Sequence, residues 1–180
     1  YGASLADLVS IAMSSEERLK TQQELTNSMA ILQAIFDLSE TGIIVEDLDH
    51  NILKYNELYL KIWDFEAEFL ETRPYSEIVA ACLSKLKNSQ NIQEGLDRIK
   101  TRPGMEYAGI MEFNDGKIVE RYSKAIMVDG KLKGRVWFYL DITDRKRKEN
   151  ELINRNFELD SFVYRASHDL KAPLNSIMGL

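Results

Sequence analysis

Two Asp-Gly pairs, fourteen positions apart, constrain the fold of this 180-residue sequence most strongly. Asp115-Gly116 and Asp129-Gly130 separate three stretches that are rich in β-branched and aromatic residues. Asp-Gly readily adopts the positive φ angles that a two-residue hairpin turn requires. The sequence therefore predicts three consecutive antiparallel strands, at 105–113, 117–128 and 131–140.

Side chains of the third strand alternate between two faces of the sheet. One face carries Leu132, Gly134, Val136, Phe138 and Leu140, and the other carries Lys133, Arg135, Trp137 and Tyr139. We interpret the second set as the outer face. A pair of large aromatic side chains is rarely left exposed to solvent, and we expect the N-terminal helix to pack over them.

That helix is predicted because residues 4–38 contain neither proline nor glycine and are rich in Glu, Gln, Lys, Leu and Ala. Two short heptad seams follow its surface and are out of phase near Gln22. They consist of Leu5, Leu8, Ala12 and Leu19, and of Leu25, Met29, Leu32 and Phe36. Two interpretations stay open, a helix that packs on the following domain and a coiled coil.

The pattern changes after Gly42. Residues 43–45 and 52–55 predict two short strands of a hairpin around a turn at 47–51. Asn56 is a good N-cap for a helix that runs through Trp63. Helical patterning resumes at 75–99, where we expect a single helix.

The order strand, strand, helices, three strands resembles a PAS domain, and so does the ending Asp141-Ile142-Thr143-Asp144-Arg145. The resemblance implies an α+β fold, a five-stranded antiparallel sheet with helices on one face, flanked by coiled-coil-type helices. We assign residues 1–32 to the N-terminal helix, 33–144 to the PAS domain and 145–180 to an exit helix. Asp141, Ile142, Thr143 and Arg145 are expected to relay a signal from the sheet to that helix.

The exit helix shows a heptad seam with spacings of four and three residues, which is typical of a two-stranded coiled coil. The seam consists of Leu152, Asn156, Leu159, Val163, Ala166 and Leu170. A buried Asn156 would fix register at a cost in stability. We therefore expect a homodimer, with His168 on the solvent side of the helix.

The string Ser167-His168-Asp169-Leu170-Lys171-Ala172-Pro173-Leu174 resembles the phosphoacceptor box of bacterial sensor histidine kinases. The resemblance implies that His168 accepts a phosphoryl group and that Asp169 acts as its general base. Pro173 is expected to bend the helix beside the histidine. Many relatives carry Thr or Asn where this sequence has Ala172, so phosphatase activity by that route is not expected.

Nothing in the sequence resembles the ATP-binding half of such kinases. A first residue that is tyrosine, and a last residue inside a helical pattern, lead us to expect a piece of a longer protein. The parent would be an ATP-dependent histidine kinase in a phosphorelay, and the piece alone would be inactive. Expected partners are the kinase's own ATP-binding domain and the receiver domain of a response regulator.

Composition argues against nucleic-acid binding and against a membrane-spanning segment. A net charge of −6 argues against nucleic acid as a partner. No run of about 20 apolar residues is available to span a membrane, and the single Cys82 fits a reducing, cytoplasmic setting. We therefore expect a cytoplasmic region of a parent that is either soluble or membrane-anchored.

No cofactor is expected in this piece. Haem is disfavoured because residues 75–99 hold no histidine, and His50 is expected to be exposed in a turn. A photoactive flavin is disfavoured because the surroundings of Cys82 lack the required Asn-Cys-Arg motif, and we expect Cys82 to be a buried small hydrophobe. Two alternatives stay open, a PAS module used only for dimerisation and protein contact, and a PAS module that binds a small ligand.

Overall fold

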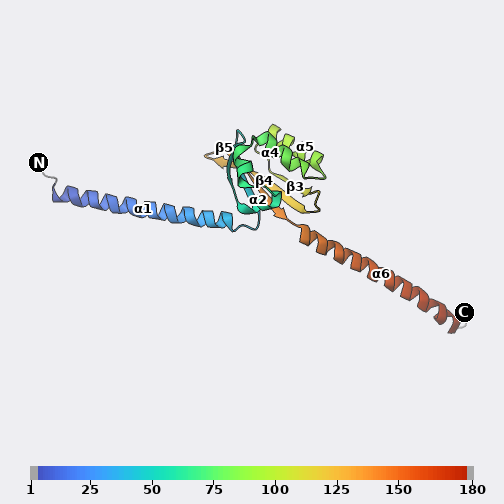
Figure 1. Cartoon of the computed structure of the whole chain (residues 1–180). Coiled ribbons are helices and arrows are strands. Elements are labelled where there is room, and N and C mark those ends of the chain that lie inside the picture. The colour runs from blue at the N-terminus through green and yellow to red at the C-terminus, as the bar shows by residue number, and fades with distance from the viewer. Residues whose placement is uncertain (1–3, 178–180) are drawn as a thin grey trace.

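A five-stranded antiparallel sheet forms the centre of the molecule in the computed structural model, which describes the backbone of residues 4–177 (Figure 1). Side chains are described for Ser4 and for residues 13–167. The strand order is β2-β1-β5-β4-β3. The strands are β1 (Gly42–Asp47), β2 (Ile52–Tyr55), β3 (Tyr107–Glu112), β4 (Ile118–Val128) and β5 (Lys131–Asp141). Both Asp-Gly hairpins are confirmed: Gly116, Asp129 and Gly130 all have positive φ.

Four short helices cover one face of this sheet, as the α+β prediction requires (Figure 1). They are α2 (Glu57–Trp63), α3 (Ala67–Thr72), α4 (Tyr75–Ser84) and α5 (Ser89–Thr101). Asn56 caps α2 as predicted, because its side chain accepts a hydrogen bond from the amide of Tyr59 at 3.0 Å. Helix α3 was not anticipated from the sequence.

The single helix predicted at 75–99 is wrong, since α4 and α5 are separate. Between them the chain bonds to the edge of β3: Lys87 donates its amide to the carbonyl of Glu112, and Leu86 forms a bridge with Phe113. Asn88 then bonds the carbonyl of Ile110 and the amide of Glu112 through its side chain. These contacts to a strand distant in sequence replace the helical hydrogen bonds that the periodicity implied.

The outer-face assignment on β5 is also wrong. Trp137 and Tyr139 are buried in the core beneath α2–α5, beside Ile44 of β1. The alternation itself is correct, but the helices cover the opposite face from the one expected. Arg135 is buried on this face as well, and its guanidinium donates to the Ser123 hydroxyl and to the carbonyls of Pro103 and Met105.

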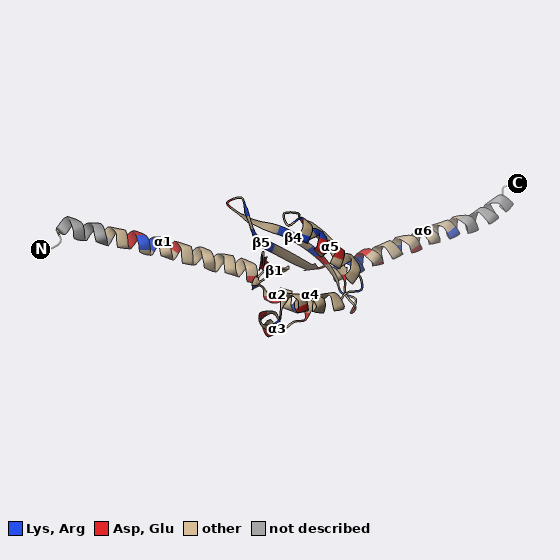
Figure 2. Ribbon diagram, turned by 90° about the horizontal axis from the view of Figure 1, so that it is seen from above, with Lys and Arg blue, Asp and Glu red and all other residues tan. Residues whose placement is uncertain are grey.

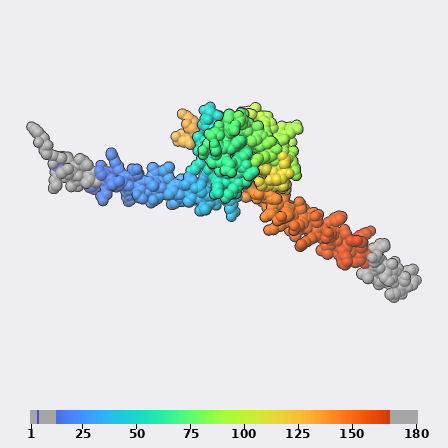
Figure 3. All heavy atoms as spheres, in the orientation of Figure 1, coloured from blue at the N-terminus to red at the C-terminus, as the bar shows by residue number. Residues whose placement is uncertain are grey.

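The long helix α1 (Leu5–Asp37) does not cover the sheet. Figures 1 and 3 show it projecting away from the domain, and residues 13–35 are all exposed. Packing of this stretch on the domain is therefore wrong, and the coiled coil stays a prediction. Among the described side chains, the contacts to the domain lie at the end of the helix, where Phe36 lies beneath Lys54 and offers its carbonyl to Asn56.

The second long helix, α6 (Thr143–Ile177), leaves the domain in another direction (Figures 1 and 2). α1 continues through residue 37 and α6 begins at residue 143, so both helices reach into the range 33–144 that was assigned to the PAS domain. Among residues 4–177, no helix combines the length and the apolar character that a membrane crossing needs.

Candidate functional site

The junction between β5 and α6 keeps its hydrogen bonds to the sheet while the chain turns into a helix. Ile142 is buried, and its amide donates to the carbonyl of Ile118 at 2.9 Å. The amide of Ile118 donates in turn to the Thr143 hydroxyl at 2.9 Å. Asp141 accepts from the amide of Thr143 at 2.9 Å, and its carboxylate also lies beside the Thr143 hydroxyl. The start of α6 is thus bonded to β4 through both the carbonyl and the amide of Ile118.

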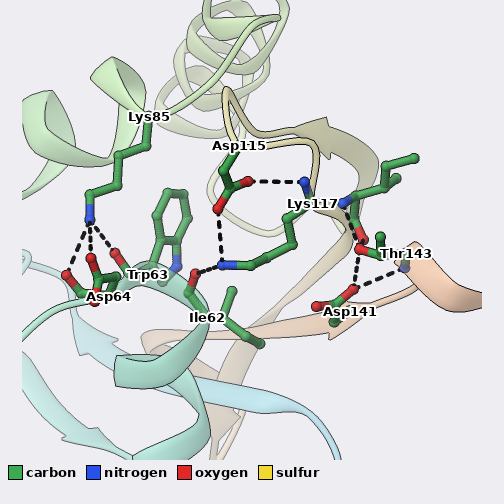
Figure 4. A network of polar contacts seen from close by, with 9 residues as sticks. Ile62, Trp63, Asp64, Lys85, Asp115, Lys117, Asp141 and Thr143 are labelled. Atoms are coloured by element: carbon green, nitrogen blue, oxygen red, sulfur yellow. Dashed lines mark hydrogen bonds and ion pairs between the residues drawn. The ribbon is translucent and has the colours of Figure 1, made fainter.

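Figure 4 shows two lysines at the end of α2: Lys117 connects the junction to the helical layer, and Lys85 links the end of α4 to α2. Lys117, next to Ile118, donates from Nζ to the carbonyl of Ile62 at 2.9 Å. Lys85 donates from Nζ to the carbonyl of Trp63 at 2.6 Å. Both cations therefore lie at the C-terminus of α2, where free carbonyls carry partial negative charge. The junction, the β3–β4 hairpin and α2 are joined in one polar network.

Arg145, the fourth residue predicted to relay a signal, makes a looser contact. Its guanidinium lies 3.4 Å from the Glu120 carboxylate of β4, and both side chains are exposed. An exposed ion pair of this kind contributes about 0–1 kcal/mol. The structure thus brings Asp141, Ile142 and Thr143 together tightly and Arg145 only at their rim.

The seam predicted on α6 is solvent-exposed in the single chain. Asn156, Leu152, Leu159 and Val163 are exposed, and Ala166 is half-buried. Exposed leucines and valine at heptad spacing leave an apolar stripe without a partner within the described residues. Leu170, the sixth seam residue, lies in α6, but its side chain is outside the described ones.

The phosphoacceptor box lies on the same helix. α6 runs without interruption from Thr143 through His168, Asp169 and Pro173 to Ile177. The side chains of these three residues lie outside the described part of the structure, so their predicted roles and the bend at Pro173 stay predictions.

A small cavity lies between the sheet and the helices, with a volume of ≈ 60 Å³. Its walls are mostly apolar and aromatic, and they include Ile44, Tyr59, Trp63, Ile78, Leu96, Trp137 and Tyr139. Two charged side chains, Glu46 of β1 and Arg121 of β4, also line it, and both are buried. Neither was singled out from the sequence, because both faces of β1 and β4 mix polar and apolar residues.

The buried Glu46 carboxylate contacts two side chains, Trp137 and His50. It accepts a hydrogen bond from the Trp137 indole at 2.9 Å and lies 3.5 Å from Nδ1 of His50. Burial, and next the Glu46 carboxylate, raise the pKa of Tyr75. His50 stacks on the Tyr75 ring at 4.4 Å between centroids and is half-buried, so its expected exposure in the turn holds only in part.

Cys82 also lines the cavity, and burial raises the pKa of its thiol to about 12. The thiol is therefore neutral at physiological pH, but the residue is half-buried, so the predicted buried small hydrophobe holds only in part. Among the residues that the structure describes, no group of three or more His, Cys, Asp or Glu side chains could hold a metal ion.

A wider pocket of ≈ 400 Å³ adjoins this cavity and shares Glu46, Tyr75, Val79, Leu96 and Trp137 with it. His50 and Lys100 line the wider pocket but not the small cavity. The shared residues form the boundary between the two spaces.

Comparison with known proteins gives two kinds of similarity. No family model matches the sequence. The chain is 26% identical over 175 residues to the cell-division control histidine kinase PdhS of Brucella anthropi, covering 88% of this chain and 16% of that protein. The PdhS protein of Brucella abortus strain 2308 is 26% identical over 191 residues, covering 97% and 17%. The chain thus spans about a sixth of the length of these relatives.

Solved structures share the fold. The PAS domain of Bordetella pertussis BvgS aligns with a TM-score of 0.50 at 17% identity, covering 73% of this chain and 98% of that one. An RNA-binding light-oxygen-voltage receptor aligns with a TM-score of 0.51 at 15% identity, covering 71% and 36%. At these identities the likeness shows the fold alone, and the fold agrees with the one that the sequence pattern predicted.

Proposed function

We propose that this chain, which has the PAS fold between two long helices, is the sensor region and the first transmitter helix of a histidine kinase. The observation that carries the proposal is the β5–α6 junction. Ile118 bonds to both Ile142 and Thr143, so a change in the position of β4 moves the first turn of α6 directly. The similarity to PdhS covers up to 97% of the chain and so extends beyond the sheet into the flanking helices.

Helix α6 then conveys the displacement. At about 1.5 Å of rise per residue, the stretch from Thr143 to His168 is about 37 Å long. A rotation or shift at Thr143 would reach His168 if two copies of α6 pair through their exposed seams as a homodimer. We propose that an ATP-binding domain of the parent kinase then phosphorylates His168, with Asp169 as general base. The phosphoryl group would pass to the receiver domain of a response regulator in the cytoplasm.

Phosphotransfer to the chain tests this proposal. The chain is incubated with labelled ATP and the separately produced ATP-binding domain of Brucella PdhS. The matched control uses the fact that the sequence holds only two histidines. We expect acid-labile label on the unaltered chain and on His50→Gln, and none on His168→Gln.

The reference reaction uses the dimerisation helices of PdhS itself, which the same ATP-binding domain should label. Label on PdhS but not on this chain would contradict the proposal and favour a PAS module used only for dimerisation. Label that persists in His168→Gln would show that another residue accepts the phosphoryl group.

The buried cavity supports a second proposal, that the PAS domain senses a small ligand. Its volume of ≈ 60 Å³ and its mostly apolar lining suit a molecule of a few non-hydrogen atoms.

A further inference from the structure

Arg121 is a buried cation without a hydrogen-bond partner on one edge. The residue is 3% exposed and lines the small cavity. Its Nε and Nη2 atoms are buried and make no hydrogen bond. In arginine these two nitrogens lie on the same edge of the guanidinium and can donate two parallel hydrogen bonds to one carboxylate.

The surroundings hold this edge in place without neutralising it. The guanidinium lies 4.7 Å from the centre of the Tyr107 ring and 5.0 Å from the centre of the Trp137 ring. Contacts with aromatic faces fix the plane of the group and offset part of the cost of burying its charge. They leave the hydrogen-bonding requirement of Nε and Nη2 unmet.

The charges buried beside the cavity do not balance. Arg121 and Arg135 are both buried cations, whereas Glu46 is the buried anion beside them. Glu46 contacts the Trp137 indole and His50, and Arg135 donates to neutral oxygens. Buried charges are normally paired, and here one positive charge is left over.

We propose that the cavity binds a small carboxylic acid as its anion, with the carboxylate paired to Nε and Nη2 of Arg121 and the alkyl group against the apolar wall. This inference rests on the proposal that the PAS domain senses a small ligand. The volume of ≈ 60 Å³ corresponds to roughly four water-sized spaces, which is the size of an acetate or propionate ion. The apolar lining of the same cavity includes Ile92 and Leu96. The adjoining pocket of ≈ 400 Å³ provides the approach from solvent.

Thermal unfolding of the purified chain tests the proposal. Sodium acetate and sodium propionate are added at constant ionic strength, and acetamide serves as the neutral molecule of the same shape. A ligand that binds only the folded state raises Tm, and at about ten times Kd the expected rise is several degrees (~3–8 °C). We expect this saturable rise with the two anions and none with acetamide.

Two variants assign the effect to Arg121. Arg121→Met removes the guanidinium but keeps a long side chain, and it should abolish the rise in Tm without lowering Tm in the absence of ligand. Arg145→Met is the matched control because Arg145 is exposed, and its response to acetate should equal that of the unaltered chain. Arg121→Lys keeps the charge but loses the paired donors, and it should weaken acetate binding at least tenfold.

The proposal is overturned if the unaltered chain responds to neither anion, or responds equally to acetamide. It is also overturned if Arg121→Met folds and still responds. Should Arg121→Met fail to fold, Arg121→Lys and the comparison of acetate with acetamide decide the question. These measurements need no kinase domain, so their failure would leave phosphotransfer to His168 as an independent result.

Discussion

Replacement of Asn56 should lower the free energy of unfolding strongly, although it removes only a few atoms. Asn56 is 1% exposed and makes four side-chain hydrogen bonds. Its carbonyl oxygen accepts from the amides of Ile43 at 2.8 Å and Tyr59 at 3.0 Å. Its amide group donates to the carbonyls of Thr41 at 2.9 Å and Phe36 at 3.1 Å. One side chain thus joins the end of α1, the start of β1 and the N-terminus of α2.

Replacement by alanine removes all four bonds. Loss of the N-cap of α2 costs about 1 kcal/mol. The amide of Ile43 and the carbonyl of Thr41 each lose a partner at about 1 kcal/mol, and water can reach the carbonyl of Phe36 more easily. The free energy of unfolding of Asn56→Ala should therefore fall by about 3 kcal/mol.

Urea denaturation measures this loss, followed by the fluorescence of Trp63 and Trp137, which are both buried in the core. With a slope of about 2 kcal/mol per M, the midpoint should fall by about 1.5 M. Asn51→Ala is the control, because Asn51 is exposed and bonds within its own turn, and its loss should stay below about 1 kcal/mol. A loss below 1 kcal/mol in Asn56→Ala as well would refute the reasoning.

Three further predictions concern packing, titration and assembly. Gly134→Ala should destabilise the domain by about 2 kcal/mol or more, because the added Cβ would lie 2.2 Å from the carbonyl oxygen of Glu46, whereas Gly104→Ala meets nothing within 4 Å and should be neutral in the same urea assay. Cys82 should resist alkylation at pH 8 until the protein unfolds. The pKa of its thiol rises from 9.0 to about 12 on folding, so the stability that the neutral thiol contributes is fully present below pH 9 and is lost as pH rises toward 12. Urea midpoints measured between pH 9 and pH 12 should therefore fall less in Cys82→Ala than in the unaltered chain. Asn156→Leu should tighten the proposed homodimer at least tenfold in sedimentation equilibrium, and an unchanged dimer would contradict the seam assignment.

Local sequence determined the parts of this protein whose physical cause is local. The Asp-Gly hairpins follow from the φ angles that these residues tolerate, and the cap at Asn56 follows from a side chain that reaches the next turn of backbone. The two long helices follow from stretches with good helix formers, although Pro173 lies within α6. The Asp141-Ile142-Thr143 junction was also recognisable, because the string Asp141-Ile142-Thr143-Asp144-Arg145 resembles the end of a PAS domain.

Contacts between residues distant in sequence decided the rest. The alternation of β5 was readable, but which of its faces is covered depends on where α2–α5 pack, and these helices bury Arg135 together with Trp137 and Tyr139. The break between α4 and α5 depends on bonds to β3 that helical periodicity cannot reveal. Arg121 resembles any exposed strand arginine until β5 places Trp137 against it and the helices close over the cavity. The sequence by itself therefore determined the two Asp-Gly hairpins, the cap at Asn56 and the two long helices. Only the tertiary structure decided where α4 ends and which charge is buried, because both depend on neighbours that are distant in sequence.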